Sequence, residues 1–288
     1  MTLPRHVGAA RSQVASGAAD DCELAFALGG RGGNAGTDDG SIGKDERVKF
    51  EASGFVTGHL ARSVEPVIGG EKIANLTVAR CFVHDLAASQ AAVAPGKTVL
   101  FLVVELCTLS FRRDDWSKSN IVATALFGDG AAAALLSTEG EGPALVAAGE
   151  HTWPGSLDVM GWEVADDGLR AIFSRDIPKL VTTRLRDAVS QFLARHGLAI
   201  DEIDRFVCHP GGTKVIAALE HAFGLGQGAL VEARAVLRDY GNMSAATVMF
   251  VLERMLAKAR ATGARWERAL MNALGPGFTA GFLVIDNR

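Results

Sequence analysis

The stretch Leu237-Arg238-Asp239-Tyr240-Gly241-Asn242-Met243-Ser244-Ala245-Ala246-Thr247 sets an asparagine in a tight turn that contains a glycine. Apolar residues then recur at the spacing of one helix face, at Val248, Met249, Val251, Leu252, Met255 and Leu256. The pattern predicts a long amphipathic helix that begins directly after the turn. Asn242 could aim its side-chain NH2 at an oxygen that gains negative charge. Taken alone, it has the simpler explanation of a left-handed turn residue, the commoner role of Asn beside Gly.

A histidine lies in a second turn of this kind. The run Phe206-Val207-Cys208-His209-Pro210-Gly211-Gly212 predicts a strand that delivers His209 into a glycine-rich bend. One histidine at a strand end is more often structural than catalytic. The Pro-Gly-Gly sequence, however, permits a sharp turn and leaves room for a ligand beside the imidazole. Cys208 points to the opposite side of the strand, which favours a core thiol over a nucleophile. Together, His209 and Asn242 suggest chemistry on an acyl carbonyl.

The composition narrows the class of protein. A chain of 288 residues with 48% hydrophobic residues and a net charge of −4 can bury a large core, in one domain or two halves. No basic stripe interleaved with aromatic residues is visible, so nucleic-acid binding is not expected. The sequence contains no apolar run long enough for a membrane span, and secretion is not expected because residues 1–6 lead into no apolar segment. Dispersed cysteines argue against disulfides and structural zinc and favour a reduced, cytoplasmic protein; they are Cys22, Cys81, Cys107 and Cys208.

The chain changes character near Pro95. Before it, residues 29–43 are glycine-rich and are expected to form a loop or a disordered segment. A phosphate-binding loop is a weak alternative there, because no helix start follows. After Pro95 we expect strands at 98–106, 130–137, 143–149, 205–209, 268–274 and 278–286, and helices at 119–127, 178–196 and 214–223. Strands that alternate with helices predict α/β layers with helices on both faces of the sheet.

Two further glycine-containing segments allow two explanations each. Gly275-Pro276-Gly277-Phe278 is either a plain hairpin turn or a loop whose backbone approaches a bound acyl group. In Phe127-Gly128-Asp129-Gly130, the aromatic ring either belongs to the core or projects into a cavity where the glycines leave space.

From Pro95 to the end, the sequence resembles type III polyketide synthases of the chalcone synthase kind, in their bacterial form. The matching motifs occur in the family's order and with family-like spacing, and they are specific only in combination. They are Val104-Glu105-Leu106-Cys107, Ser117-Lys118-Ser119-Asn120, Ala125 to Ala132, Thr152-Trp153-Pro154, Met160-Gly161-Trp162, His209 to Gly212, Leu237 to Thr247 and Leu274 to Gly277. The resemblance implies a thiolase-like layered αβαβα fold and a homodimer. It also implies acyl-CoA and malonyl-CoA as substrates, with no metal and no redox cofactor.

The resemblance also assigns roles to residues. His209 and Asn242 match the catalytic His and Asn, and Phe127 matches the aromatic gatekeeper between the CoA tunnel and the cavity. Cys107 and Ser110 match positions near the cavity wall. Gly211 and Lys214 match the loop beside the pantetheine arm, and Gly275, Pro276 and Gly277 match the loop of the cyclisation cavity. Residues 95–142 would be the remainder of the N-terminal thiolase-like half, and residues 143–288 the C-terminal half.

Residues 1–94 do not resemble the family, whose N-terminal half is much longer. The nucleophilic cysteine is expected near Thr77, and Cys81 is the cysteine closest to that position, without the small residues that normally surround it. A chance cysteine on a helix, with His84 one turn away, is the alternative. The chain is therefore either a synthase rebuilt around Cys81 or a catalytically dead homologue that binds acyl-CoA or pairs with an intact synthase. An initiating ketoacyl synthase is a third alternative, which Pro-Gly-Gly after the histidine disfavours.

Overall fold

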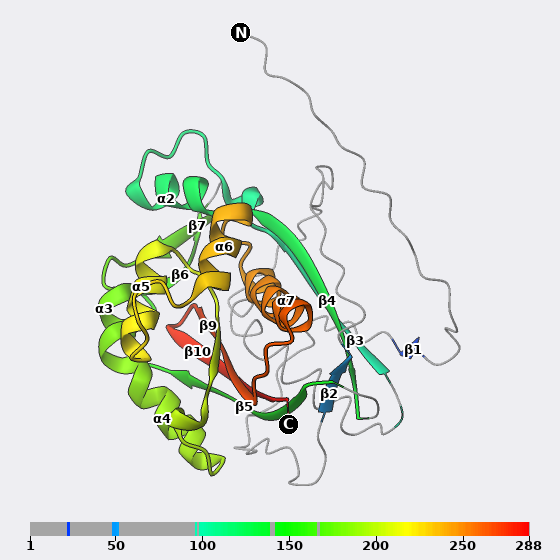
Figure 1. The fold of residues 1–288 in the computed structure, drawn as a ribbon. Coiled ribbons are helices and arrows are strands. Elements are labelled where there is room, and N and C mark those ends of the chain that lie inside the picture. The colour runs from blue at the N-terminus through cyan, green and yellow to red at the C-terminus, as the bar shows by residue number, and fades with distance from the viewer. Residues whose placement is uncertain are drawn as a thin grey trace, which may run out of the picture.

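The computed structural model describes residues 98–138, 142–165 and 168–287, together with Gly96 and two short strands. Its centre is an eight-stranded sheet in the order β1-β3-β4-β2-β5-β10-β9-β8 (Figure 1). The strands are β1 (Cys22–Glu23), β2 (Val48–Glu51), β3 (Thr98–Leu106), β4 (Asp129–Ser137), β5 (Ala144–Thr152), β8 (Arg205–Cys208), β9 (Arg268–Gly275) and β10 (Thr279–Asp286). The six strands expected from the sequence are all present.

Most neighbouring strands of the sheet are antiparallel. β3 pairs with β4 over their full lengths, and β10 pairs with β5 on one side and β9 on the other. β8 runs parallel to β9, and β1 runs parallel to β3. β8 stops at Cys208 while β9 continues to Gly275. The last residues of β9 therefore extend beyond the end of their neighbour, where His209 turns away from the sheet.

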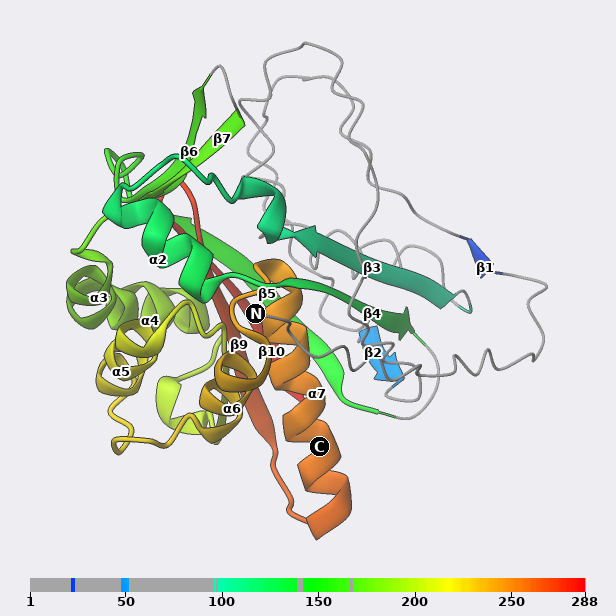
Figure 2. The same ribbon diagram turned by 90° about the horizontal axis from the view of Figure 1, so that it is seen from above.

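Helices cover both faces of the sheet, as expected. One layer contains α3 (Ile177–Leu180), α4 (Arg186–Arg195) and α5 (Thr213–Ala222), and the other contains α7 (Ala245–Thr262) with α6 (Val231–Tyr240) packed against it. Figure 2 shows β9 and β10 passing between these two groups. A Cβ atom added to Gly149 on β5 would lie 3.0 Å from the ring of Phe192, so the glycine lets α4 approach the sheet closely.

The long helix expected at 178–196 is continuous in space but not regular. A π-helical turn, η3 (Val181–Leu185), joins α3 to α4. Its wider turn still buries Val181 and Leu185 in the core. The helix ends at Arg195 and is followed by Gly197, whose φ of 68° suits a residue without a side chain.

Several elements were not predicted from the sequence. α6 begins at Val231, so Leu237 to Tyr240 end a helix and do not form part of the turn around Asn242. The hairpin of β6 (Met160–Ala165) and β7 (Gly168–Phe173) forms a separate two-stranded sheet. Short 3₁₀ turns lie at η2 (Cys107–Ser110) and η4 (Ile200–Glu202).

The predicted helix at 119–127 is present as α2 (Lys118–Leu126), and the Ser117 side chain caps its N-terminus.

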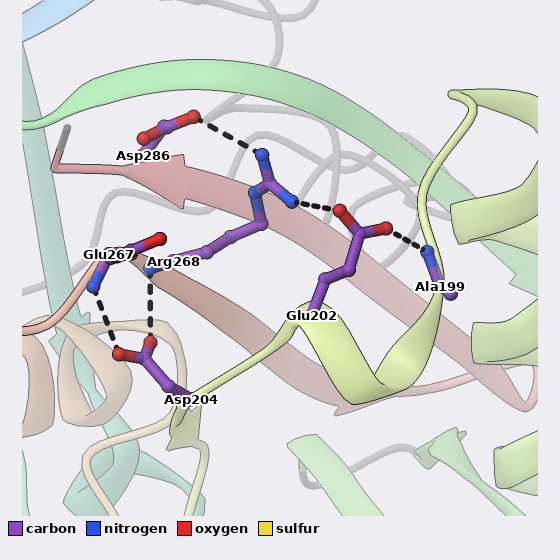
Figure 3. Close-up of polar contacts among 6 residues, drawn as sticks. All are labelled: Ala199, Glu202, Asp204, Glu267, Arg268 and Asp286. Carbon is purple, nitrogen blue, oxygen red and sulfur yellow. Dashed lines mark hydrogen bonds and ion pairs between the residues drawn. The ribbon is translucent and has the colours of Figure 1, made fainter.

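The Arg268 guanidinium fastens the start of β9 to its neighbours. It pairs with Glu202 at 3.0 Å and, at 3.4 Å, with the buried carboxylate of Asp286 on β10 (Figure 3). Asp204 accepts the backbone N–H groups of Glu267 and Arg268 at 2.9 and 3.0 Å. The Ala199 N–H group and Arg268 together hold the pKa of Glu202 below its usual range. These ion pairs and hydrogen bonds connect the first residue of β9 to its neighbours, at the end of the strand opposite Gly275.

Within the described ranges, no helix is both long and apolar enough to cross a membrane.

Candidate active site

A cavity of about 770 Å³ opens where β8 ends. Its wall is drawn from α2, the β6–β7 hairpin, the start of α3, the loop after β8, the turn before α7, and the facing parts of β9 and β10. Apolar side chains supply most of the wall, including Val122, Leu126, Trp162, Val215, Val248 and Phe282. A small number of polar groups in a mainly apolar cavity is the usual composition of a site for an organic ligand.

Phe127 and Asn242 are joined through their backbones. They form an isolated parallel bridge, in which Asn242 N–H donates to Leu126 C=O at 2.8 Å and Gly128 N–H donates to Asn242 C=O at 3.0 Å. The Phe127 ring also packs edge-on against Phe173 of β7, with centroids 5.7 Å apart. Both Phe127 and Asn242 line the cavity. The backbone of Phe127, after α2, is therefore fixed beside the backbone of Asn242, shortly before α7.

The turn that carries Asn242 is fixed by its own hydrogen bonds. The Oδ1 atom of Asn242 accepts Ser244 N–H at 2.9 Å, while Thr247 Oγ1 accepts Met243 N–H and donates to Ser244 C=O, both at 2.8 Å. Because Oδ1 is used in this way, the free donor of the amide is Nδ2, and no described residue accepts from it. Asn242 itself does not have a positive φ, whereas Gly241 and Ser244 do, with φ of 72° and 52°. A positive φ at a serine is strained backbone, which tends to occur at functional sites.

Glu105 supports the same turn from β3. Its side chain is buried, and Oε1 accepts the N–H of Ala245, the first residue of α7, at 3.4 Å. A carboxylate at a helix N-terminus is stabilised by the unpaired N–H groups and the helix dipole. The Glu105 carboxylate therefore helps to hold α7, and with it Asn242, against the sheet.

His209 enters the cavity directly after β8. Its backbone N–H donates to Asn272 C=O at 2.9 Å, and only 8% of the residue is exposed. Burial lowers the pKa of His209 to about 4, so the imidazole is neutral at pH 7 and has one N–H to donate. A Cβ atom on Gly211 would lie 3.9 Å from Nε2, so this glycine leaves space beside that nitrogen. Neutral histidine and a free amide donor thus border one cavity.

The Gly275–Phe278 turn joins β9 to β10 as a hairpin and also reaches the cavity, and its approach to a bound acyl group stays a prediction. Gly275 and Pro276 line the cavity, and Gly277 takes a φ of 110°. The buried Ser156 fixes the turn, because its Oγ accepts Phe278 N–H at 2.7 Å and lies within hydrogen-bonding distance of the carbonyl oxygens of Trp153 and Gly277. Gly277 N–H donates to Met160 C=O at 3.1 Å, which ties the turn to β6.

The structure brings most of the predicted site residues to this cavity. Its lining includes His209, Asn242, Phe127, Cys107, Gly211, Lys214, Gly275 and Pro276. Ser110 lies elsewhere: its Oγ donates to Cys107 C=O, and the residue lines a neighbouring polar cavity of about 620 Å³. Cys81 lies outside the described residues. Cys208 is fully buried, and this burial raises the pKa of its thiol far above the usual range, in keeping with a core thiol.

Three supporting residues were not identified from the sequence, namely Glu105, Ser156 and Thr247. Thr247 is the third residue of α7, and its hydroxyl bonds back to Met243 N–H and Ser244 C=O in the preceding turn. In the described part of the chain, no group of three or more His, Cys, Asp or Glu side chains could hold a metal ion.

Comparison of the sequence with known protein families assigns the chain to one of them. The sequence profile described as "Chalcone and stilbene synthases, C-terminal domain" matches residues 144–287. The chain belongs to the chalcone and stilbene synthase family. A second profile, "3-Oxoacyl-[acyl-carrier-protein (ACP)] synthase III", matches residues 75–152, a range that begins before residue 95 and includes Cys81.

Relatives of this chalcone and stilbene synthase homologue include type III polyketide synthases. A Bacillus subtilis (strain 168) protein, named as a chalcone synthase, is 41% identical over 201 residues, covering 67% of this chain and 54% of that protein. The 1,3,6,8-tetrahydroxynaphthalene synthase of Streptomyces peucetius subsp. caesius is 40% identical over 197 residues, covering 66% and 52%. The chain thus spans about half the length of the curated relatives it matches.

Solved structures confirm the thiolase-like layered fold. The PKS-I enzyme of the brown alga Ectocarpus siliculosus superposes with a TM-score of 0.67 at 26% identity, covering 73% of this chain and 57% of that one. The 1,3,6,8-tetrahydroxynaphthalene synthase of Streptomyces coelicolor A3(2), described as a bacterial type III polyketide synthase, gives 0.66 at 25% identity, covering 72% and 59%.

Proposed function

We propose that the chain condenses an acyl-CoA starter with malonyl-CoA by decarboxylative Claisen condensation and releases a pyrone or an aromatic polyketide. The observation that carries this proposal is the pair of neutral donors, His209 and Asn242, on one largely apolar cavity. Neutral donors suit an oxygen that becomes negative during the reaction, because they stabilise it without forming an ion pair with the substrate carboxylate beforehand.

The condensation would use these donors in its second step. A cysteine thiolate first attacks the starter thioester, and CoA leaves as its thiolate. Loss of CO₂ from malonyl-CoA then leaves an electron pair as the thioester enolate, whose oxygen accepts from Asn242 Nδ2 and the imidazole N–H. The enolate carbon attacks the acyl-cysteine, and the enzyme thiolate leaves. Removing one donor of this kind costs on the order of 10²–10³ in rate.

Three exposed cations support a CoA thioester as the ligand. Lys118, Arg175 and Lys214 all line the cavity, and none has an ion-pair partner among the described residues. Exposed cations beside an apolar cavity suit a ligand with a phosphorylated head and an acyl tail. We expect binding of acyl-CoA to weaken as ionic strength rises, and removal of Lys214 to reduce that dependence.

A homodimer forms part of the proposal. Leu102, Val104 and Leu106 lie on one side of β3 and are 51%, 48% and 38% exposed. Contiguous exposed apolar side chains commonly mark a protein interface. We expect a dimer in size-exclusion chromatography with light scattering, and a monomer after Leu102→Glu combined with Val104→Lys. A cytoplasmic location stays a prediction from the sequence.

Peptide mass spectrometry after incubation with a fatty acyl-CoA tests the chemistry. The expected result is an acyl adduct on Cys81 that disappears in Cys81→Ala and persists in Cys107→Ala. Release of CO₂ from malonyl-CoA should fall by about 10²–10³ in Asn242→Ala. Folded protein that forms no adduct on any cysteine would instead indicate a non-catalytic homologue that binds acyl-CoA or pairs with an intact synthase.

A further inference from the structure

One hydroxyl bridges the turn between Asn242 and α7. Thr247 is fully buried, and its Oγ1 accepts Met243 N–H and donates to Ser244 C=O, both at 2.8 Å. Ser244 C=O also accepts the backbone N–H of Thr247 at 3.1 Å, whereas Met243 N–H has no second acceptor among the described residues. Met243 is itself fully buried, so water does not reach it. Its N–H group therefore depends on the Thr247 hydroxyl.

The peptide group enclosed by this bridge orients the Asn242 side chain. Its N–H, which belongs to Ser244, donates to Asn242 Oδ1 at 2.9 Å. This bond determines which way round the carboxamide lies and leaves Nδ2 as its donor. Asn242 lines the cavity, and Nδ2 is not among the fully buried polar atoms that lack a partner. The direction of Nδ2 thus depends on the direction of the Ser244 N–H.

The backbone of Ser244 is strained in this conformation. Its φ of 52° and ψ of −131° lie in a region that glycine favours, as at the first central position of a type II′ turn. A strained conformation of this kind persists only where the surrounding contacts enforce it. Relaxation to a negative φ would turn the peptide groups on either side of Ser244, and with them the N–H that Asn242 accepts. The Thr247 hydroxyl holds the end of this segment directly and its start through Met243 N–H.

We propose that Thr247 is a positioning residue, which holds Ser244 at its positive φ and so keeps Asn242 Nδ2 directed at the reacting oxygen. Thr247 is not part of the cavity lining, so its effect on the reaction passes through Asn242. The task of Nδ2 rests on the condensation proposed above. The dependence of the Asn242 side chain on Thr247 does not, and it can be measured without turnover.

Nuclear magnetic resonance of the full chain, labelled with ¹⁵N only in asparagine, tests this dependence. The side-chain NH2 pair of Asn242 is identified by its absence from Asn242→Ala. Thr247→Val keeps the shape of the side chain without its hydroxyl, and it should shift and broaden this pair because the amide loses its fixed orientation. Thr247→Ser keeps the hydroxyl and should preserve the pair. Asn120 is the internal reference, because its Nδ2 donates to two other carbonyl groups at 2.8 and 2.7 Å.

Two further variants separate positioning from a general loosening of the fold. Glycine adopts a positive φ without steric cost, so Ser244→Gly added to Thr247→Val should return the Asn242 pair toward its wild-type position. Val189→Ala removes volume from the core at a fully buried position on α4 outside the cavity lining, and it should leave the pair unchanged. Thr247→Ala, which cannot over-pack, replaces Thr247→Val if the valine variant does not fold.

Kinetics give a second readout. In Thr247→Val, kcat for CO₂ release from malonyl-CoA should fall about 10- to 100-fold with little change in KM, and Thr247→Ser should recover it. A wild-type chain that releases no CO₂ contradicts the proposed condensation, and the spectra then decide the role of Thr247 alone. That role is overturned if Thr247→Val leaves the Asn242 pair unchanged, or if Val189→Ala disturbs the pair to the same extent.

Discussion

Replacing Gly128 with alanine should force apart the backbone bridge between Phe127 and Asn242. A Cβ atom at this position would lie 2.5 Å from the carbonyl oxygen of Tyr240, the last residue of α6. Ordinary carbon–oxygen contacts begin at about 3.3 Å, so the two segments must separate by roughly 0.8 Å. The contact is with backbone, so a change of side-chain rotamer cannot relieve it.

Two quantities should change together in Gly128→Ala. Over-packing of this kind costs about 1–3 kcal/mol in the free energy of unfolding, which corresponds to a fall in Tm of about 2–4 °C per kcal/mol. A displacement of about 1 Å in a reacting group can cost on the order of 10²-fold, so kcat should fall by about 10- to 100-fold. The assays are thermal denaturation followed by circular dichroism, and CoA release from an acyl-CoA starter and malonyl-CoA.

Gly226→Ala is the matched control. A Cβ atom there meets no other atom within 4 Å, and the residue does not adopt a left-handed conformation. It should leave Tm and kcat unchanged. The reasoning fails if Gly128→Ala behaves like the wild-type chain, or if both alanine variants lose activity to the same extent.

Three further predictions concern stability. Ser156→Ala leaves a buried backbone N–H without its acceptor and should lower the free energy of unfolding in urea by about 1–3 kcal/mol, whereas exposed Ser190→Ala should change it by less than about 0.5 kcal/mol. Folding lowers the pKa of His209 from 6.5 to about 4, so between these pH values the unfolded chain binds a proton that the folded chain does not. The free energy of unfolding should therefore decrease as the pH falls from 6.5 to 4, by up to about 3 kcal/mol. The same fall in pH should reduce the free energy of unfolding of His209→Gln by a smaller amount. Arg234→Met leaves the buried Glu220 without its 2.6 Å ion pair, which should cost about 3–5 kcal/mol at pH 7, and Glu220→Gln added to Arg234→Met should recover part of the loss.

Local patterns predicted the elements that carry strong apolar periodicity. The helix after Asn242 is present and buries its predicted apolar face. The strand at 98–106 is also present, with Val99 and Phe101 in the core but Leu102, Val104 and Leu106 exposed. α6 was missed because it buries only Ala233 and Val236, so few side chains mark its buried face in the sequence. The β6–β7 hairpin was missed although the sequence contains Asp167-Gly168, a pair typical of hairpin turns, at this place.

The arrangement of the site depended on contacts between distant residues. Phe127 and Asn242 were each recognised, but the bridge between them joins segments that are far apart in the sequence. Glu105 and Ser156 act on residues more than 100 positions away, and nothing in their immediate sequence indicates those partners. Ser110 was placed too close to the main cavity, because the 3₁₀ turn at Cys107–Ser110 carries it to the neighbouring one.

The β6–β7 hairpin supplies Met160, Gly161, Trp162 and Phe173 to the cavity wall, yet among the described strands it pairs with none of the main sheet. Substitutions in the hairpin can therefore reshape the cavity without breaking a hydrogen bond of the central sheet. His209 and the turn at Gly275 are attached to strands of the central sheet. The hairpin contacts this part of the site through the hydrogen bond from Gly277 to Met160 and through the packing of Phe173 on Phe127. Directed evolution toward a different acyl group would begin with a library at Trp162, where volume can change while the donors keep their places.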